Sequence, residues 1–233
     1  MAISPILSTP KQPKIKYPET DGKPMAENTK QFRWIVTVKE GLEAVFAADP
    51  NVFIAGDLLW YPVEGHPEIR VAPDALVAFG RPKGDRGSYL QWEEANLPPQ
   101  VVFEILSPGN TVAEMTRKYR FYDQHGVEEY YLYDPDTGEL SGWQRRGGRL
   151  EEIAEMAGWA SPRLGVRFAI EDLELALYRP DGERFQTYLE LVEARDRARQ
   201  QAEQARQQAE QAEARTQRLA EQLRALGVEP DLH

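Results

Sequence analysis

Apolar residues recur at intervals of three and four between positions 25 and 49, which is the spacing of a helix with one buried face. The stripe consists of Trp34, Ile35, Val38, Leu42, Val45 and Phe46. Asp49 and Pro50 come directly after it, and proline is typical of the region just beyond a helix end. The pattern therefore predicts one helix that ends before Asp49.

Three segments rich in β-branched and aromatic residues follow this helix. They cover residues 52–61, 69–79 and 100–106, and Gly or Pro bounds them. Such runs are typical of strands. We therefore expect three strands, with a long loop over residues 80–99 between the second and the third.

A second helix is expected after residues 107–111, where the sequence Ser-Pro-Gly-Asn-Thr ends the third strand. Asn110 or Thr111 can cap this helix, and Glu114 lies in its first turn, where the helix dipole favours an acidic residue. The order predicted so far is helix, three strands and helix, followed by a fourth strand over residues 129–134.

Two turns then predict further strands. Residues 136–138 (Asp-Thr-Gly) lead into a strand over 139–145, and a second turn leads into a strand over 150–154, so both should extend the sheet as hairpins. Residues 166–177 are expected to complete the domain. The fold class indicated is a mixed α and β domain.

The C-terminal stretch differs in kind, because residues 185–226 are dominated by Ala, Gln, Glu and Arg and contain no Gly or Pro. It predicts one long helix with a heptad seam, interrupted at Arg195. The seam residues are Leu191, Ala198, Ala202, Ala205, Ala209, Ala212, Thr216, Leu219, Leu223 and Leu226. A coiled coil is expected, with itself or an unidentified chain as partner; the alternative is a solvated single helix.

These patterns divide the chain into four parts. Residues 1–24 form an extended lead rich in Pro and Lys, residues 25–184 the main domain, residues 185–226 the coiled-coil helix, and residues 227–233 a short tail. With 233 residues and 41% hydrophobic content, the chain is long enough to bury a sizeable core.

Composition narrows the possible classes of function. The absence of cysteine excludes thiolate metal sites, and three scattered histidines make an all-histidine zinc site a poor fit. A net charge of -10 argues against a protein that coats nucleic acid through a broad basic surface. No run of eighteen apolar residues and no signal-like N-terminus occurs, so we expect a cytoplasmic protein with no membrane partner.

Two acidic residues lie within the expected buried strands. Asp74 belongs to the second strand and Glu104 to the third. Burying a carboxylate without a partner costs roughly several kcal/mol. Two buried carboxylates therefore imply a shared cation, and the simplest such cation is a metal ion with oxygen ligands. Alternatively, Asp74 is a turn residue after Pro73, and Glu104 pairs with a structural Arg.

Several ordered motifs of the central segment resemble the Uma2 family, also known as the DUF820 domain. They are Tyr17-Pro18-Glu19-Thr20-Asp21-Gly22-Lys23-Pro24-Met25, Val71-Ala72-Pro73-Asp74, Phe103-Glu104-Ile105-Leu106-Ser107-Pro108, Lys118-Tyr119-Arg120-Phe121-Tyr122, and the run from Gly126 to Pro135. The resemblance covers about residues 17–178. It implies the restriction-endonuclease-like fold of the PD-(D/E)XK superfamily, a mixed sheet flanked by helices, and metal-dependent cleavage of DNA.

The resemblance also implies site residues. Asp74 takes the Asp of the Pro-Asp motif and Glu104 the next acidic position, both as metal ligands. The superfamily lysine two residues later is replaced by Leu106, whereas the Uma2 pattern places a lysine on the following helix, at Lys118. Glu114 precedes Lys118 by four residues and so shares its helix face. The catalytic set expected is Asp74, Glu104 and Lys118, with Mg²⁺ or Mn²⁺ as cofactor.

Further residues are candidates for supporting roles. Asp57 and Glu27 are possible additional metal or outer ligands, like Glu114, and Arg117 and Arg120 are candidates for contacts with DNA phosphates.

Two functions from different classes remain open at this point. One is a metal-dependent DNA endonuclease, expected as a homo-oligomer and most simply a dimer, because a symmetric dimer can cut both strands. The other is a nuclease fold with weak or lost catalysis that acts as a binding or assembly module through its C-terminal helix.

Overall fold

The computed structural model of the chain describes residues 15–22 and 24–226. The expected N-terminal lead lies largely, and the expected C-terminal tail entirely, outside these residues. The elements are α1 (Thr29–Val45), β1 (Val52–Gly56), β2 (Trp60–Tyr61), β3 (Ala75–Phe79), β4 (Tyr89–Leu90), the 3-10 helix η1 (Gln91–Glu93), β5 (Val101–Ile105), α2 (Val112–Gln124), β6 (Glu129–Asp134), β7 (Glu139–Arg146), β8 (Arg149–Glu152), β9 (Arg167–Glu171), β10 (Glu174–Tyr178) and α3 (Tyr188–Ala225).

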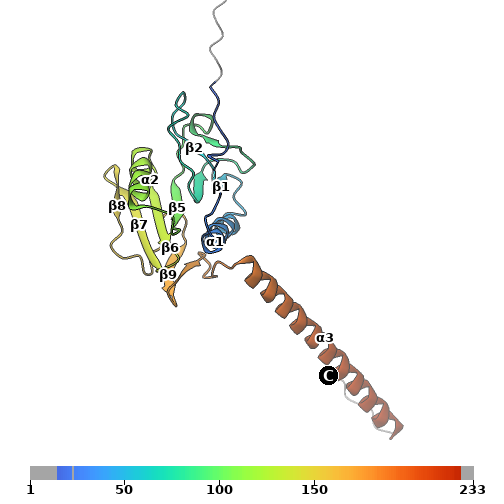
Figure 1. Cartoon of the computed structure of the whole chain (residues 1–233). Helices are drawn as coiled ribbons and strands as arrows, with labels where there is room; N and C mark the ends of the chain where they lie inside the picture. The colour runs from blue at the N-terminus through green and yellow to red at the C-terminus, as the bar shows by residue number, and fades with distance from the viewer. Residues whose placement is uncertain (1–14, 23, 227–233) are drawn as a thin grey trace, which may run out of the picture. The chain divides into compact units, whose positions relative to one another are not determined.

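A six-stranded mixed sheet forms the centre of the domain (Figure 1), with the strand order β1-β3-β5-β6-β7-β8. All neighbours are antiparallel except β5 and β6, which run parallel and are joined by α2. A parallel pair needs a crossover rather than a tight turn, and α2 supplies it. The expectation of a mixed sheet flanked by helices is confirmed.

The two faces of the sheet carry separate cores. On β5, Val101, Phe103 and Ile105 pack with residues of α1, whereas Val102 packs with residues of α2. Successive side chains of a strand point to opposite faces, so Glu104 lies on the α2 face. This alternation decides which helix can reach the Glu104 carboxylate.

The first helix is confirmed, although it is shorter than expected. Its buried residues include Trp34, Ile35, Val38 and Leu42, which belong to the expected stripe. It begins at Thr29 because the side chain of Asn28 accepts a hydrogen bond from the backbone of the first turn.

The first two expected strands are only partly correct. Residues 52–61 form β1 and β2 with a break at Asp57, whose φ of 48° lies in the left-handed region. Of residues 69–79, only the second half forms β3, because Pro73 has no N–H to donate to a ladder. Asp74 therefore precedes β3 and does not lie within it.

The expected loop over residues 80–99 contains β4, which pairs with β2, and η1, whereas the elements from β5 to β8 follow the expectation. Of the two candidate caps of α2, Thr111 is the one that accepts the hydrogen bond, from the backbone N–H of Glu114. The strand over 129–134 is β6, and the two hairpin strands extend the sheet as β7 and β8. Residues 166–177 fall in a separate two-stranded sheet, β9 and β10.

The last helix forms a unit of its own. The chain divides into two compact units, Met1–Phe185 and Gln186–His233, and α3 belongs to the second. Thr187 and Glu190 form a capping box at its start, in which each side chain binds the backbone N–H of the other residue. No helix in the described part of the chain has the length and apolar character needed to cross a membrane.

Gly138 in the turn between β6 and β7 tests how closely the β9 and β10 hairpin packs on the sheet. A Cβ at Gly138 would lie 2.3 Å from the carbonyl oxygen of Leu173, and its φ is 76°. We expect Gly138→Ala to lower the free energy of unfolding by about 1–2 kcal/mol for the left-handed backbone. Overpacking should add about 1–3 kcal/mol. Urea denaturation measures the sum.

Gly158 is the matched control, because it has the same φ of 76° and nothing within 4 Å of an added Cβ. Gly158→Ala should show the backbone cost alone. Equal losses for the two variants would contradict the close packing at Gly138.

Candidate active site

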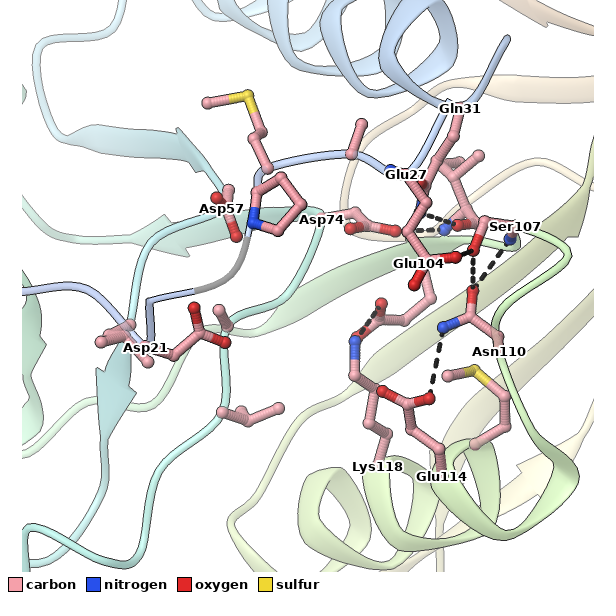
Figure 2. Close-up of a pocket in the computed structure, with 18 of the residues that line it drawn as sticks. Asp21, Glu27, Gln31, Asp57, Asp74, Glu104, Ser107, Asn110, Glu114 and Lys118 are labelled. Atoms are coloured by element: carbon pink, nitrogen blue, oxygen red, sulfur yellow. Dashed lines mark hydrogen bonds and ion pairs between the residues drawn. The ribbon is translucent and has the colours of Figure 1, made fainter. Parts of the chain in front are cut away.

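A cavity of about 240 Å³ is lined by polar residues from several segments that lie far apart in the sequence. It collects side chains from the segment before α1, the loops before β2 and β3, the end of β5 and the first half of α2 (Figure 2). Its ionisable lining residues are Asp21, Glu27, Asp57, Arg70, Asp74, Glu104, Glu114 and Lys118. Six of these eight residues are acidic, so the cavity is suited to a cation.

Glu104 is the most deeply buried charged group of this cavity, with 2% of its surface exposed. One carboxylate oxygen accepts a hydrogen bond from Lys118 Nζ at 2.7 Å, and the other accepts one from the hydroxyl of Tyr122. Both partners come from one face of α2, since they lie four residues apart. The two bonds fix the orientation of the carboxylate.

Lys118 is a charged ammonium group in this setting. Burial favours its neutral form, but the charges of Glu104 and Asp74 outweigh burial and raise the pKa of Lys118. Only 18% of its side chain is exposed, so the protein covers most of the side chain whose ammonium group reaches the cavity. A lysine with a raised pKa keeps its proton at neutral pH.

Asp74 is 8% exposed and lies on the same cavity. Its Oδ2 accepts a hydrogen bond from the backbone N–H of Ile105 at 2.6 Å, which ties the start of β3 to the end of β5. Burial, followed by the charge of Glu104, raises the pKa of Asp74 well above its ordinary value, despite the opposing effect of Lys118. Asp74 is therefore a buried carboxyl whose charge the described side chains do not fully compensate.

Asp57 lines the same cavity, from the break between β1 and β2 (Figure 2). Partial burial, followed by the charge of Asp21, raises its pKa. The charge of Lys118 acts in the opposite direction, and that of Glu104 reinforces the rise. Asp57 is thus electrostatically coupled to the Glu104 and Lys118 pair.

Glu27 lies at the cavity but is already engaged. Its Oε2 accepts hydrogen bonds from the hydroxyl of Ser107 at 2.6 Å and from the backbone N–H of Gly109 at 3.1 Å. Its own backbone N–H donates to Gln31, whose side chain in turn donates to the carbonyl oxygen of Ile105 at 2.8 Å. These contacts hold the segment before α1 against the end of β5.

The other expected residues are placed differently. Glu114 lines the cavity and accepts a long hydrogen bond of 3.4 Å from Asn110. Arg117 and Arg120 are exposed on α2 and do not line the cavity. Leu106 lines a separate apolar groove together with Trp143 and other residues, whereas Lys118 lines the cavity.

Two residues of the site were not anticipated in these roles. In the sequence Tyr122 stands out only as part of a family motif, and only its position four residues after Lys118 hints that its hydroxyl reaches the same carboxylate. Arg70 lines the cavity from an irregular segment, where no periodic pattern indicates the direction of a side chain.

The described side chains do not form a ready-made metal cage. Within residues 15–22 and 24–226, no three His, Asp or Glu side chains are arranged as a set that could hold a metal ion. Asp74 and Glu104 supply two carboxylates at one cavity. The number of carboxylates limits which ions this cavity can bind.

A family model with the description "Putative restriction endonuclease" matches residues 10–175, which is more than half of the chain. The chain belongs to the Uma2 family. The Uma2 match contains every residue of the cavity and ends before α3. Membership supports a nuclease-like function for the domain and confirms the resemblance seen in its motifs.

One solved structure similar to the Uma2 domain is that of a protein from Anabaena variabilis ATCC 29413, described as a putative nuclease belonging to DUF820. The two share 18% sequence identity with a TM-score of 0.48, and the match covers 66% of this chain and 87% of that chain. No curated relative matches the sequence.

The raised pKa of Asp74 predicts that a substitution which removes its charge stabilises the protein at neutral pH. Its folded-state pKa lies above the ordinary value of 3.8, so the folded chain binds more protons over the interval between the two values. Stability is therefore lost as pH rises through this interval. Without divalent ions, Asp74→Asn should remove this loss and raise the free energy of unfolding at pH 7 by about 1–3 kcal/mol.

Glu104→Gln is the contrasting control. It leaves the Lys118 ammonium group without its anionic partner and should lower stability by about 1.5–3 kcal/mol. Thermal unfolding at a series of pH values compares the variants with the wild type. An Asp74→Asn protein less stable than wild type at pH 7 would show that the carboxylate is compensated after all.

Proposed function

We propose that this protein is a metal-dependent endonuclease that hydrolyses phosphodiester bonds of DNA, with Asp74, Glu104 and Lys118 as its catalytic residues. One observation carries the proposal: Lys118 from α2 and the carboxylates of Asp74 and Glu104 line one cavity. Uma2 membership supports the same reading.

The residues present fit a hard divalent cation, Mg²⁺ or Mn²⁺, held by Asp74 and Glu104. Mg²⁺ typically binds one or two carboxylates and keeps several waters or substrate phosphates, so it needs no cage of three protein ligands. The high pKa of Asp74 is what a site short of positive charge produces. When bound, such an ion polarises a phosphoryl oxygen and lowers the pKa of an attacking water.

Lys118 acts through its charge. Because its pKa is raised, it cannot accept a proton from water at neutral pH and so does not serve as general base. Its ammonium group is suited to position a water molecule or to stabilise the negative charge that develops on the phosphate. Tyr122 and the backbone N–H of Ile105 keep Glu104 and Asp74 in place.

The other residues have supporting roles in this proposal. Asp57 and Glu114 are additional carboxylates for an ion or its waters, while Glu27 shapes the cavity through Ser107. Arg117 and Arg120 are exposed where a DNA backbone approaching α2 would meet their charges.

A second candidate function is a nuclease fold that binds or assembles without cutting. The ion pair between Lys118 and Glu104 favours it, because the pair can stabilise the fold without any metal. Incubation of the purified chain with supercoiled plasmid and Mg²⁺ or Mn²⁺ separates the two. The endonuclease converts the plasmid to nicked or linear DNA, whereas absence of cleavage across divalent ions and DNA substrates supports the module.

Substitution of Lys118 tests the assigned roles. Lys118→Ala should lower the cleavage rate by roughly 10²-fold or more, as loss of one electrostatic donor does in other enzymes. It should leave metal binding largely intact, because Lys118 donates no ligand. Asp74→Ala should abolish both cleavage and binding. Mn²⁺ titration by calorimetry, beside the plasmid assay, measures the two effects.

Lys30→Ala is the control for a lysine outside the cavity, since Lys30 makes an exposed ion pair with Asp136. Its cleavage rate should equal that of the wild type. Unchanged cleavage by a folded Lys118→Ala protein would reject the role of this lysine.

A further inference from the structure

The helix α3 carries apolar residues that unit 2 leaves uncovered. Leu191 is 52% exposed and Leu226 79% exposed, and Tyr188, Leu219 and Leu223 are exposed as well. Long helices gain most of their stability from packing of one face, so an unpaired seam of this length is unexpected for an isolated helix. The helix lies outside the Uma2 match, so its role is not inherited from the family domain.

The seam is large at both ends and small in the middle. With the heptad frame that begins at Tyr188, the seam positions are Tyr188, Leu191, Arg195, Ala198, Ala202, Ala205, Ala209, Ala212, Thr216, Leu219, Leu223 and Leu226. Bulky residues occupy the first two and the last three positions, and alanine dominates between them. The profile of side-chain size along the seam is therefore similar from the N-terminal end and from the C-terminal end of the helix.

The charges of α3 form four alternating stretches. Residues 188–196 carry -2, residues 197–206 carry +2, residues 207–213 carry -2, and residues 214–225 carry +2. The first holds three acids and one arginine, the third two glutamates, and the second and fourth three arginines and one glutamate each. The helix is therefore neutral as a whole, although the chain carries -10.

We propose that α3 pairs with α3 of a second copy of this chain in antiparallel orientation. Reversing one helix sets each acidic stretch beside a basic one, whereas a parallel pair in register sets like charges together along its whole length. Exposed charge pairs add little affinity, but like-charge contacts exclude the wrong arrangement. Charge thus selects the orientation, and the apolar seam supplies the attraction.

One register satisfies the seam over its entire length. Placing Tyr188 beside Leu226 of the second copy also places Leu191 beside Leu223, and it centres the alanines on one another. Arg195, the charged member of the seam, then lies beside Leu219, along whose side chain its methylene groups can extend. In a parallel pair Arg195 would face Arg195.

The antiparallel pair separates the points where the main domains join their helices. A helix of 38 residues spans about 57 Å at 1.5 Å per residue. The two helix starts therefore lie about that far apart, at opposite ends of the pair. This inference does not depend on whether the Uma2 domain cleaves DNA.

Disulfide trapping in the full-length chain tests the orientation, because the protein has no cysteine of its own. Ala198→Cys and Thr216→Cys are prepared separately, one of them labelled with ¹⁵N, and then mixed, allowed to exchange and oxidised. In the antiparallel register Ala198 lies beside Thr216 of the second copy. The two Ala198 residues are then about 27 Å apart along the axis, too far for a disulfide.

The expected result is a covalent dimer that contains one chain of each variant, with little dimer from either variant alone. Dimers formed by each variant alone would show a parallel pair and overturn the orientation. A wild-type chain that sediments as a monomer throughout the concentration range, with no trapping, would overturn self-association.

A pair of substitutions identifies the seam as the attractive surface. Leu219→Glu combined with Leu223→Glu should weaken dimerisation by about tenfold or more in sedimentation equilibrium. The control, Gln200→Glu with Gln207→Glu, adds the same charge on the side opposite the seam and should leave the dissociation constant nearly unchanged. Equal effects of the two double variants would contradict the assignment of the seam.

Discussion

The bond network around Glu104 is the interaction on which the rest of the domain's site depends. A carboxylate on a central strand would be costly to bury alone, and α2 supplies a cation and a hydroxyl to its two oxygens. This requirement fixes the rotation of α2 about its own axis, because Lys118 and Tyr122 must both face the sheet. The same rotation places Tyr119 toward the aromatic core beneath α2, where its ring meets that of Trp143. Electrostatic pairing and apolar packing therefore require the same orientation of one helix.

Asp74 shows the opposite balance. Its side chain accepts a hydrogen bond from the backbone N–H of Ile105, and its pKa is raised by burial and by the charge of Glu104. A group of this kind lowers stability while it is ionised, because the charge of Lys118 only partly offsets the effect of burial and of Glu104. Perturbed carboxyl groups in a cavity are therefore good candidates for function, because active sites are where burial and like charges shift pKa values. Glu104 and Asp74 are thus chemically alike but lie in unequal surroundings, since Glu104 accepts hydrogen bonds from two side chains and Asp74 accepts one from a backbone N–H.

The sequence predicts much of the fold and part of this site, for identifiable reasons. Strand alternation in β5 and the four-residue step between Glu114 and Lys118 are local patterns, and each gives the correct face of its element. The sequence suggests that Asp74 lies within a strand because Val71 to Phe79 is apolar apart from Asp74, yet β3 begins only at Ala75, after Pro73. The sequence does not reveal the role of the Tyr122 hydroxyl, because an aromatic residue on the inner face of a helix is usually explained by packing alone. Whether Lys118 meets Glu104 depends on how α2 crosses the sheet, which no local pattern contains.

Glu27 has a consequence for how the cavity responds to what enters it. It links the segment that precedes α1, on one face of the sheet, with Ser107 and Gly109 in the loop that leads to α2, on the other. The Glu27 carboxylate therefore joins two segments from opposite faces of the sheet, at the C-terminal end of the central strand β5. An anionic molecule in the cavity would repel this carboxylate, whereas a cation would draw it inward. A charge that enters the cavity would therefore act directly on the contact that joins the segment before α1 to the loop before α2.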